Sequence, residues 1–323
     1  IKMSSLDQFA SEFASLAWGP WLVFLLLGSG AYFLIRSSLT PFKHLAHAFA
    51  VLVGKHKTKS DVGDVSSFKA LAASLSGTIG LGNIAGVAVA IQVGGPGAIF
   101  WMWVTAIFGI ATKFFTCTLS VMYREVDPNG DTRAGPMYVV KNGLPKYMLP
   151  LAYFFAFFGM IGCLAAFQSN QIVQITKDLY FENIINFEYF AGIFLMVITA
   201  LVILGGLKRI ATVASWLVPF MAGLYLIAVL FAILLNFESF IPSLLLIFSE
   251  AFNANSAISG GIAGVIITGI RRGAFSNEAG IGTEAMIHGA AKTSHPVKQG
   301  LVAMTGPIFD TLIMCTLTAL VIL

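Results

Sequence analysis

The stretch that decides the fold runs from Ala70 to Val93 and reads ALAASLSGTIGLGNIAGVAVAIQV. It is long enough to cross a lipid bilayer as a helix, and it contains no charged residue. Gly77, Gly80, Gly82 and Gly86 fall close together in it, and each glycine costs about 1 kcal/mol relative to alanine inside a helix. We expect this span to unwind halfway across the membrane, where free backbone groups can hold a ligand or an ion.

The composition is that of an all-α polytopic membrane protein. Hydrophobic residues make up 57% and charged residues 11% of the 323 positions, against roughly 25% charged residues in soluble domains. The net charge of +4 is spread over the loops, which argues against a nucleic-acid partner. The cysteines lack metal-site spacing, and no acid or nucleophile constellation stands out, so we expect neither a cofactor nor an enzyme.

Apolar runs predict eight spans after a short interfacial helix at residues 3–16. Their boundaries lie where apolar runs meet charged or turn residues, at 18–35, 70–93, 98–122, 146–170, 189–206, 210–235, 257–270 and 299–323. Pro219 is expected to kink the sixth span. With the amino terminus outside, sixteen of the nineteen Lys and Arg residues fall on the inner side, including Arg271 and Arg272 after the seventh span. This imbalance satisfies the positive-inside rule.

The seventh span is also short, glycine-rich and interrupted, and it crosses in the direction opposite to the second. Paired interrupted spans in two oppositely oriented halves indicate the inverted repeat of secondary transporters, with a site near the midplane. The domains expected are an extra first span with its interfacial helix at 1–35, a first five-span repeat at 70–235, and the first two spans of a second repeat at 257–323. Because apolar sequence continues to Leu323, we interpret the second repeat as incomplete in this chain.

The broken second span supplies the first candidate binding residues. Thr78, Gly80, Gly82 and Asn83 offer a hydroxyl, an amide and bare backbone at one level of the membrane. A broken helix presents amides to an anion and carbonyls to a cation. Close helix packing through small residues is the alternative explanation of the glycines, and the matching seventh span favours a site.

A polar face at the end of the fourth span supplies a second set. Phe167, Asn170, Gln171 and Gln174 are spaced so that they share one side of a helix and could line a pocket wall. The alternative is that this helix has simply reached water.

Two ionisable residues lie well inside spans, where charge is costly and indicates function. Lys113 either snorkels to the interface or acts within the membrane. Asp310, beside Thr311, either coordinates a cation or makes a buried polar bond. Glu278 and Glu284 follow the double arginine and either pair with it or take part in gating.

Several long motifs, in this order, resemble the alanine/glycine:cation symporter family of bacterial and archaeal sodium-coupled amino-acid importers. The motifs are GTIGLGNIAGVAVA, GGPGAIFWMWVTAIFGIATKF, GIRRGAFSNEAGIGTEA, AAKTSHPVKQGLVAM and GPIFDT. The resemblance covers nearly all of the chain from Trp18 to Leu323. It implies a leucine-transporter-type inverted repeat preceded by one extra span.

The resemblance also implies a substrate site for a small amino acid. Its carboxylate would meet freed amides of the second span, and apolar neighbours such as Phe167 and Ile267 would limit its size. The implied substrate-binding residues are Thr78, Gly80, Gly82, Phe167, Asn170, Gln171, Gln174, Ile267, Thr268 and Gly269. The candidate cation residues, which follow from their places inside the spans and not from the resemblance, are Asn83, Asp310 and Thr311.

The chain departs from the family's wording at two places. Where many members read ATKFAE, this chain reads ATKFFT, with Thr116 in place of the acid. Where many read GSAP, it has Gly282, Thr283, Glu284 and Ala285.

The function expected from the sequence is sodium-coupled import of alanine or glycine by alternating access. The expected location is the inner membrane of a prokaryote, and the expected partners are the lipid bilayer, the amino acid and sodium. The alternative is an ion or solute channel lined by the broken spans.

Overall fold

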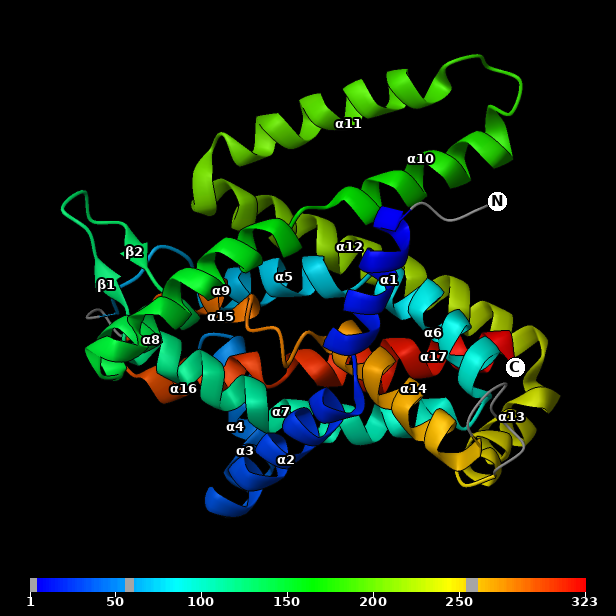
Figure 1. The fold of residues 1–323 in the computed structure, drawn as a ribbon, viewed down its shortest axis with the longest axis horizontal. Coiled ribbons are helices and arrows are strands. Elements are labelled where there is room, and N and C mark those ends of the chain that lie inside the picture. Colours follow the sequence, from blue (N-terminus) through cyan, green and yellow to red (C-terminus); the bar gives the residue numbers. More distant parts are fainter. Residues whose placement is uncertain (1–4, 56–60, 254–260) are drawn as a thin grey trace.

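The computed structural model describes residues 5–55, 61–253 and 261–323, which are almost entirely helical (Figure 1). In chain order the elements are α1 (Ser5–Ala17), α2 (Pro20–Arg36), α3 (Thr40–Lys43), α4 (Leu45–Leu52), α5 (Ser67–Thr78), α6 (Leu81–Gly94), α7 (Ala98–Met122), β1 (Glu125–Val126), β2 (Thr132–Arg133), α8 (Pro136–Gly143), the 3-10 turn η1 (Lys146–Met148), α9 (Leu149–Gly162), α10 (Ala166–Tyr180), α11 (Phe187–Ile203), α12 (Gly206–Leu235), α13 (Phe237–Glu250), α14 (Gly261–Asn277), α15 (Glu284–Gly289), α16 (Pro296–Ala303), the π-helix η2 (Ile308–Cys315) and α17 (Thr316–Ile322).

Among the described residues, five helical stretches are long and apolar enough to cross a membrane. They are Ser11–Arg36, Ser67–Gly94, Ala98–Met122, Gly206–Leu235 and Pro296–Ile322. The second of these is interrupted between α5 and α6, as the glycines predict, and α7 spans the predicted 98–122. Shorter apolar helices cover 146–162 and 187–203.

Two predicted spans differ from the structure. The fourth is not one helix, because it divides into α9 and α10 around residues 163–165. The seventh does not end at the double arginine: α14 continues through Arg271 and Arg272 to Asn277. These two arginines therefore do not belong to a loop, and the count of inner Lys and Arg residues falls from sixteen to fourteen.

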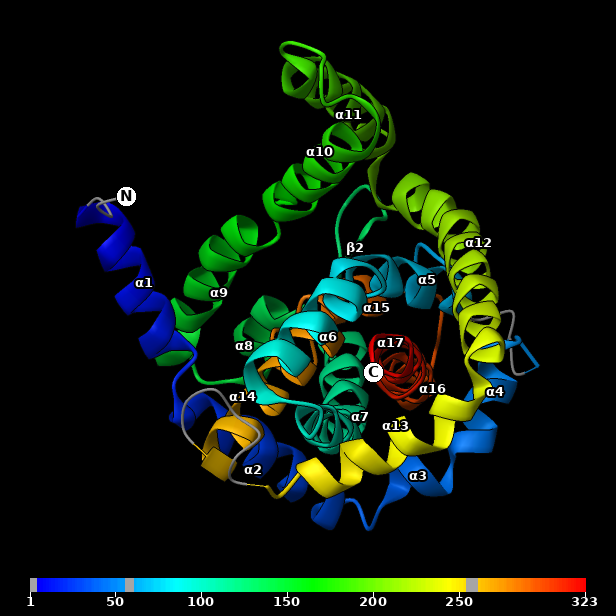
Figure 2. The ribbon, with the colours of Figure 1, turned by 90° about the vertical axis from the view of Figure 1, so that its right-hand side faces the viewer.

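The core lies around α7, which packs against α2, α14, α15 and α16. Figure 2 shows α7 and α17 near the middle, with α5, α6, α12, α13 and α14 around them. Small residues allow this close approach, as is common between membrane helices. A Cβ added at Gly300 would lie 2.6 Å from the Phe114 carbonyl oxygen. A Cβ added at Gly273 would lie 2.9 Å from Thr105 Cβ, and one added at Gly289 would overlap Ser120 Oγ.

One end of the bundle, formed by residues 61–65, 124–133 and 289–295 together with the start of α12, is fastened by polar contacts. Arg124, just past α7, donates to four backbone carbonyl oxygens at 2.8 to 3.1 Å, those of Val62, Gly289, Ala291 and Thr293. Partial burial lowers the pKa of its guanidinium, because desolvation disfavours the charge. The arginine thus joins the segment before α5 to the segment after α15.

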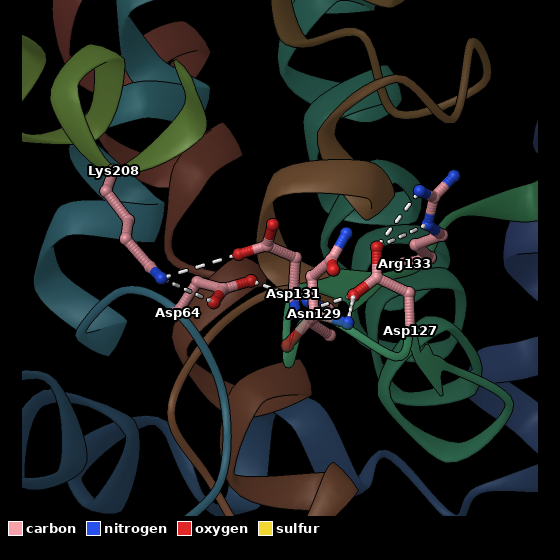
Figure 3. Close-up of polar contacts among 7 residues, drawn as sticks. Asp64, Asp127, Asn129, Asp131, Arg133 and Lys208 are labelled. Carbon is pink, nitrogen blue, oxygen red and sulfur yellow. Dashed lines mark hydrogen bonds and ion pairs between the residues drawn. The ribbon is translucent and has the colours of Figure 1, made fainter. Parts of the chain in front are cut away.

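A second group of contacts at this end is shown in Figure 3. The largely buried carboxylate of Asp64 accepts the backbone N–H of Thr132 at 2.8 Å and pairs with Lys208 at 3.3 Å. Lys208 also lies 3.5 Å from the exposed Asp131. The β1–β2 hairpin is held on its other side by the Arg133–Asp127 pair at 3.0 Å. These contacts tie α12 and the hairpin to the segment that leads into α5.

Candidate functional site

The interruption of the second span lies at Ile79 and Gly80, between α5 and α6. Ile79 leaves the helical conformation, and the Asn83 side chain then begins α6 by accepting the Gly80 N–H at 3.1 Å. The backbone N–H groups of Asn83 and Ile84 donate to the Gly80 carbonyl. The first N–H groups of a helix have no intrahelical acceptor, and its dipole favours an anion there. The start of α6 is therefore suited to a carboxylate.

A second interruption, at residues 278–283 between α14 and α15, lies beside the first. A Cβ added at Gly77 would lie 3.6 Å from the Glu278 carboxylate, and one added at Gly82 would lie 3.5 Å from the Ser276 Cα. Further along, Gly94 contacts Thr268. Residues 77, 82 and 94 of the second span thus lie beside residues 278, 276 and 268 of the seventh. The two broken spans therefore run antiparallel, with their interruptions side by side.

Asp310 is the centre of the polar contacts at this place. It is 1% exposed. Asn83 Nδ2 donates to Asp310 Oδ1 at 2.8 Å and to the Asp310 backbone carbonyl at 2.9 Å. Ser276 Oγ and Thr311 Oγ1 donate to Asp310 Oδ2 at 2.9 and 2.8 Å. We call Asn83, Ser276, Asp310 and Thr311 the Asp310 cluster.

The backbone around Asp310 departs from the α-helical form. Residues Ile308–Cys315 form a π-helix that begins directly after Pro307. Proline lacks the N–H that an α-helix requires, and π-helical turns recur at functional sites in membrane and soluble proteins alike. This local geometry places Asp310 and Thr311 together on the side that meets α6 and α14.

The Asp310 cluster has the donor set of a site for a small hard cation. It offers carboxylate and hydroxyl oxygens, which such cations prefer. The Asn83 amide presents its nitrogen to Asp310 and its oxygen to the Gly80 N–H. One carboxylate balances one positive charge, and a buried carboxylate is costly without a counter-charge. When a cation binds, the two hydroxyl groups can rotate so that their lone pairs face it.

The structure brings six of the residues predicted from the sequence to one place. Thr78 is buried at the end of α5, and Gly80 and Gly82 lie at the interruption. Asn83, Asp310 and Thr311, which the sequence indicates as cation residues, belong to one hydrogen-bonded cluster.

The predicted face of the fourth span lies elsewhere. Asn170 and Gln174 are exposed and line a groove between α10 and α11, and Gln171 is half-buried on α10. This helical hairpin projects from the bundle in both Figures 1 and 2. Phe167 belongs to α10, and its side chain lies outside the described part of the structure.

Ile267, Thr268 and Gly269 also lie away from the interruptions. Gly269 packs directly on the Ala98 carbonyl, and Thr268 packs on Gly94. They stand at least seven residues from Ser276, or about 10 Å along α14, so the structure places them where α14 packs between α6 and α7.

Ser276 is the member of the Asp310 cluster that the sequence does not single out. The sequence indicates Ser276 only weakly as a binding residue, because a serine in a helix commonly forms a hydrogen bond with the backbone of its own helix. Two features indicate it in retrospect: it is the last residue but one of α14, close to the second interruption, and it is followed by the polar Asn277 and Glu278.

Known proteins of one family resemble this chain along most of its length. The sequence profile of the sodium:alanine symporter family matches residues 3–323. The chain is 44% identical over 312 residues to the sodium/alanine symporter AgcS of Methanococcus maripaludis, covering 95% of this chain and 68% of that protein.

Two relatives from Bacillus subtilis are similar over nearly the whole chain. The amino-acid carrier protein AlsT is 39% identical over 99% of this chain and 66% of its own length. The probable sodium/glutamine symporter GlnT is 38% identical over 98% of this chain and 66% of its own length. A match of the family profile along almost the entire sequence, together with relatives at this identity, shows that this multi-pass membrane chain belongs to the sodium:alanine symporter family of transporters.

Proposed function

We propose that this chain imports a small neutral amino acid, alanine or glycine, together with sodium. The observation that carries the proposal is the antiparallel pair of broken spans, whose interruptions meet at the Asp310 cluster. A site between two interrupted helices can bind an anion and a cation in the same place, because helix ends of both polarities converge there.

Sodium is assigned to the Asp310 cluster. Asp310 supplies the negative charge, and Ser276 and Thr311 supply hydroxyl oxygens. Asn83, whose amide nitrogen donates to Asp310 in this structure, would have to turn its amide oxygen toward the ion. These side chains come from α6, α14 and η2, so a bound ion would hold three elements together. Transport requires that the ion binds one conformation better than the other, and a ligand set spread over three elements meets that requirement.

The amino-acid carboxylate is assigned to the start of α6. The backbone of Gly80 and Gly82 is accessible there because no Cβ covers it, and Thr78 lies directly before the interruption. We assign the seventh-span contribution to the end of α14 at Ser276, in place of Ile267, Thr268 and Gly269. The α10 face with Phe167, Asn170, Gln171 and Gln174 can complete this site only if α10 moves toward α6.

The architecture proposed is the leucine-transporter-type inverted repeat. Residues 70–235 form the first repeat, residues 257–323 contribute two spans of the second, and residues 1–35 add an extra span. The antiparallel course of the two broken spans supports this division. With the amino terminus outside, the end fastened by Arg124 faces the cytoplasm, in accord with the excess of Lys and Arg in its loops.

The test is uptake of labelled alanine and glycine by proteoliposomes that contain the full-length transporter. Uptake should require an inward sodium gradient, saturate, and show counterflow, and the Thr78→Ala variant should weaken it. Uptake that is unchanged when choline replaces sodium would refute sodium coupling. Single-channel currents without counterflow would support a channel instead.

A further inference from the structure

Lys113 is a buried lysine that the proposed transport site does not use. It lies in the middle of α7 and is 1% exposed. A charge at this depth requires a counter-charge, because neither lipid nor packed helices solvate it. Snorkelling to an interface does not apply to a side chain that is enclosed on all sides.

The ammonium group lies against the turn that precedes Asp310. A Cβ added at Gly306 would lie 3.4 Å from Lys113 Nζ, and Gly306 stands four residues before Asp310. Because residues four apart on a helix are separated by about one turn, the ammonium group lies about one turn from Asp310. A tethered cation therefore stands beside the proposed sodium site.

Glu284 is a second buried carboxylate, on a helix that packs against α7. It begins α15 and is 2% exposed, and neither of its carboxylate oxygens has a hydrogen-bond partner among the described residues. One helical turn along α7, Cys117 packs on Ala285, so the two helices meet at this level. Other polar groups nearby have partners at some of their atoms: Glu278 accepts from Thr283, and His288 Nδ1 lies 2.6 Å from Gln299 Nε2. His288 Nε2 and Gln299 Oε1 have no hydrogen-bond partner among the described residues.

The sequence points to the same pair. Thr116 stands three residues after Lys113 on α7. Residues three apart on a helix are neighbours. An acid at position 116 would therefore face Lys113 from α7 itself, whereas Glu284 belongs to α15.

From these contacts we propose that Lys113 is an internal competitor of sodium, and that Glu284 sets the strength of the competition by drawing the ammonium group away from Asp310. The proposal rests on the assignment of sodium to the Asp310 cluster. Because Glu284 belongs to α15, its distance from Lys113 depends on the position of the second half of the broken seventh span. Lys113 and Glu284 are positioning residues, and they do not contact the substrate.

The test measures the sodium concentration for half-maximal alanine uptake by the full-length transporter. In Glu284→Gln the ammonium keeps only Asp310 as its counter-charge, so this concentration should rise roughly fivefold or more, while the maximal rate at saturating sodium changes little. Glu182→Gln, which neutralises an exposed acid, is the matched control and should behave as the parent.

Two further variants separate competition from structural damage. Thr116→Glu combined with Glu284→Ala returns an acid to α7 and should restore the parental sodium concentration to within about twofold. Lys113→Gln combined with Glu284→Gln removes the competitor with its counter-charge and should require no more sodium than the parent. If the double variant needs as much sodium as Glu284→Gln alone, Lys113 is not a competitor and the proposal is wrong.

Stabilisation of the purified protein by sodium during thermal unfolding provides a readout that needs no transport. The sodium concentration that gives half of this stabilisation should be higher in Glu284→Gln than in the parent. In the two double variants it should equal the parental concentration again. A parent protein that shows no sodium dependence would refute the sodium assignment itself. A sodium-dependent parent with unchanged variants would refute only the role of Lys113 and Glu284.

Discussion

The amide nitrogen of Asn83 donates to the carboxylate of Asp310 at 2.8 Å, although 227 residues separate them in the chain. The bond joins the start of α6 to η2, and Ser276 adds the end of α14 to the same carboxylate. A single buried aspartate thus connects both broken spans with the eighth span. Any event that changes the charge at Asp310 alters the contacts of all three.

Neutralising Asp310 should therefore remove the dependence on sodium. In Asp310→Asn the side chain keeps its size but loses the charge, and an interaction with a charged group is worth about 1.5–3 kcal/mol. The sodium concentration for half-maximal uptake should rise at least tenfold. Flux measurements over a sodium series check this, with Glu238→Gln as the neutralised exposed acid for comparison. Sodium dependence equal to that of the parent would place the ion elsewhere.

Gly269 should be intolerant of a side chain. An added Cβ would overlap the Ala98 carbonyl and lie 2.5 Å from the Trp101 Cβ. Overpacking of this kind typically costs about 1–3 kcal/mol, so Gly269→Ala should lower the thermal unfolding temperature of the purified protein. The matched change is Gly86→Ala, whose Cβ would meet only a carbonyl at 3.9 Å. Equal unfolding temperatures for the two variants would contradict the close packing of α14 on α7.

Arg124 should be a large contributor to the stability of the fastened end. Arg124→Lys keeps the charge but cannot reach four carbonyl oxygens with a planar set of donors. Left without partners, these carbonyls should cost about 2–4 kcal/mol in total. Arg133→Lys, in an ion pair with Asp127 that is exposed on the arginine side, should cost far less than Arg124→Lys. Thermal unfolding of both variants tests the difference, and a similar small effect for each would argue against the four-carbonyl contact.

The two acids that contact Lys208 should differ in importance. Asp64 is largely buried and also accepts a backbone N–H, whereas Asp131 is exposed. Asp64→Asn should lower stability by about 1–2 kcal/mol, and Asp131→Asn by less than about 0.5 kcal/mol. Raising the salt concentration should diminish the second effect more than the first, because exposed pairs are screened. Hydrogen exchange at the Thr132 amide would report the loss of its acceptor directly.

Local signals in the sequence were sufficient to predict the interruption between α5 and α6. Glycine weakens a helix wherever it occurs, so Gly80 and Gly82 indicate the break without knowledge of the fold. Asp310 was predictable for a similar reason, since a charge inside an apolar run is costly in any arrangement.

Other features depend on contacts between distant segments, and the sequence alone did not reveal them. Arg271 and Arg272 suggest the end of a span by their charge, yet α14 continues through them because its other faces are buried against α6 and α7. Ser276 becomes significant only when η2 is placed beside it. Residues 163–165, where the fourth span divides, include no proline and no charged residue that would predict the division.

The contacts of Arg124 also determine when this end of the bundle can fold during synthesis of the chain. Three of its four acceptors lie 165 to 169 residues later in the chain. At a rate of about 5–20 residues per second, ribosomes reach them roughly 8–30 s after Arg124 has been made. During this interval the earlier spans enter the membrane before Arg124 has three of its acceptors. Its hydrogen bonds to Gly289, Ala291 and Thr293 can form only after the seventh span has been made.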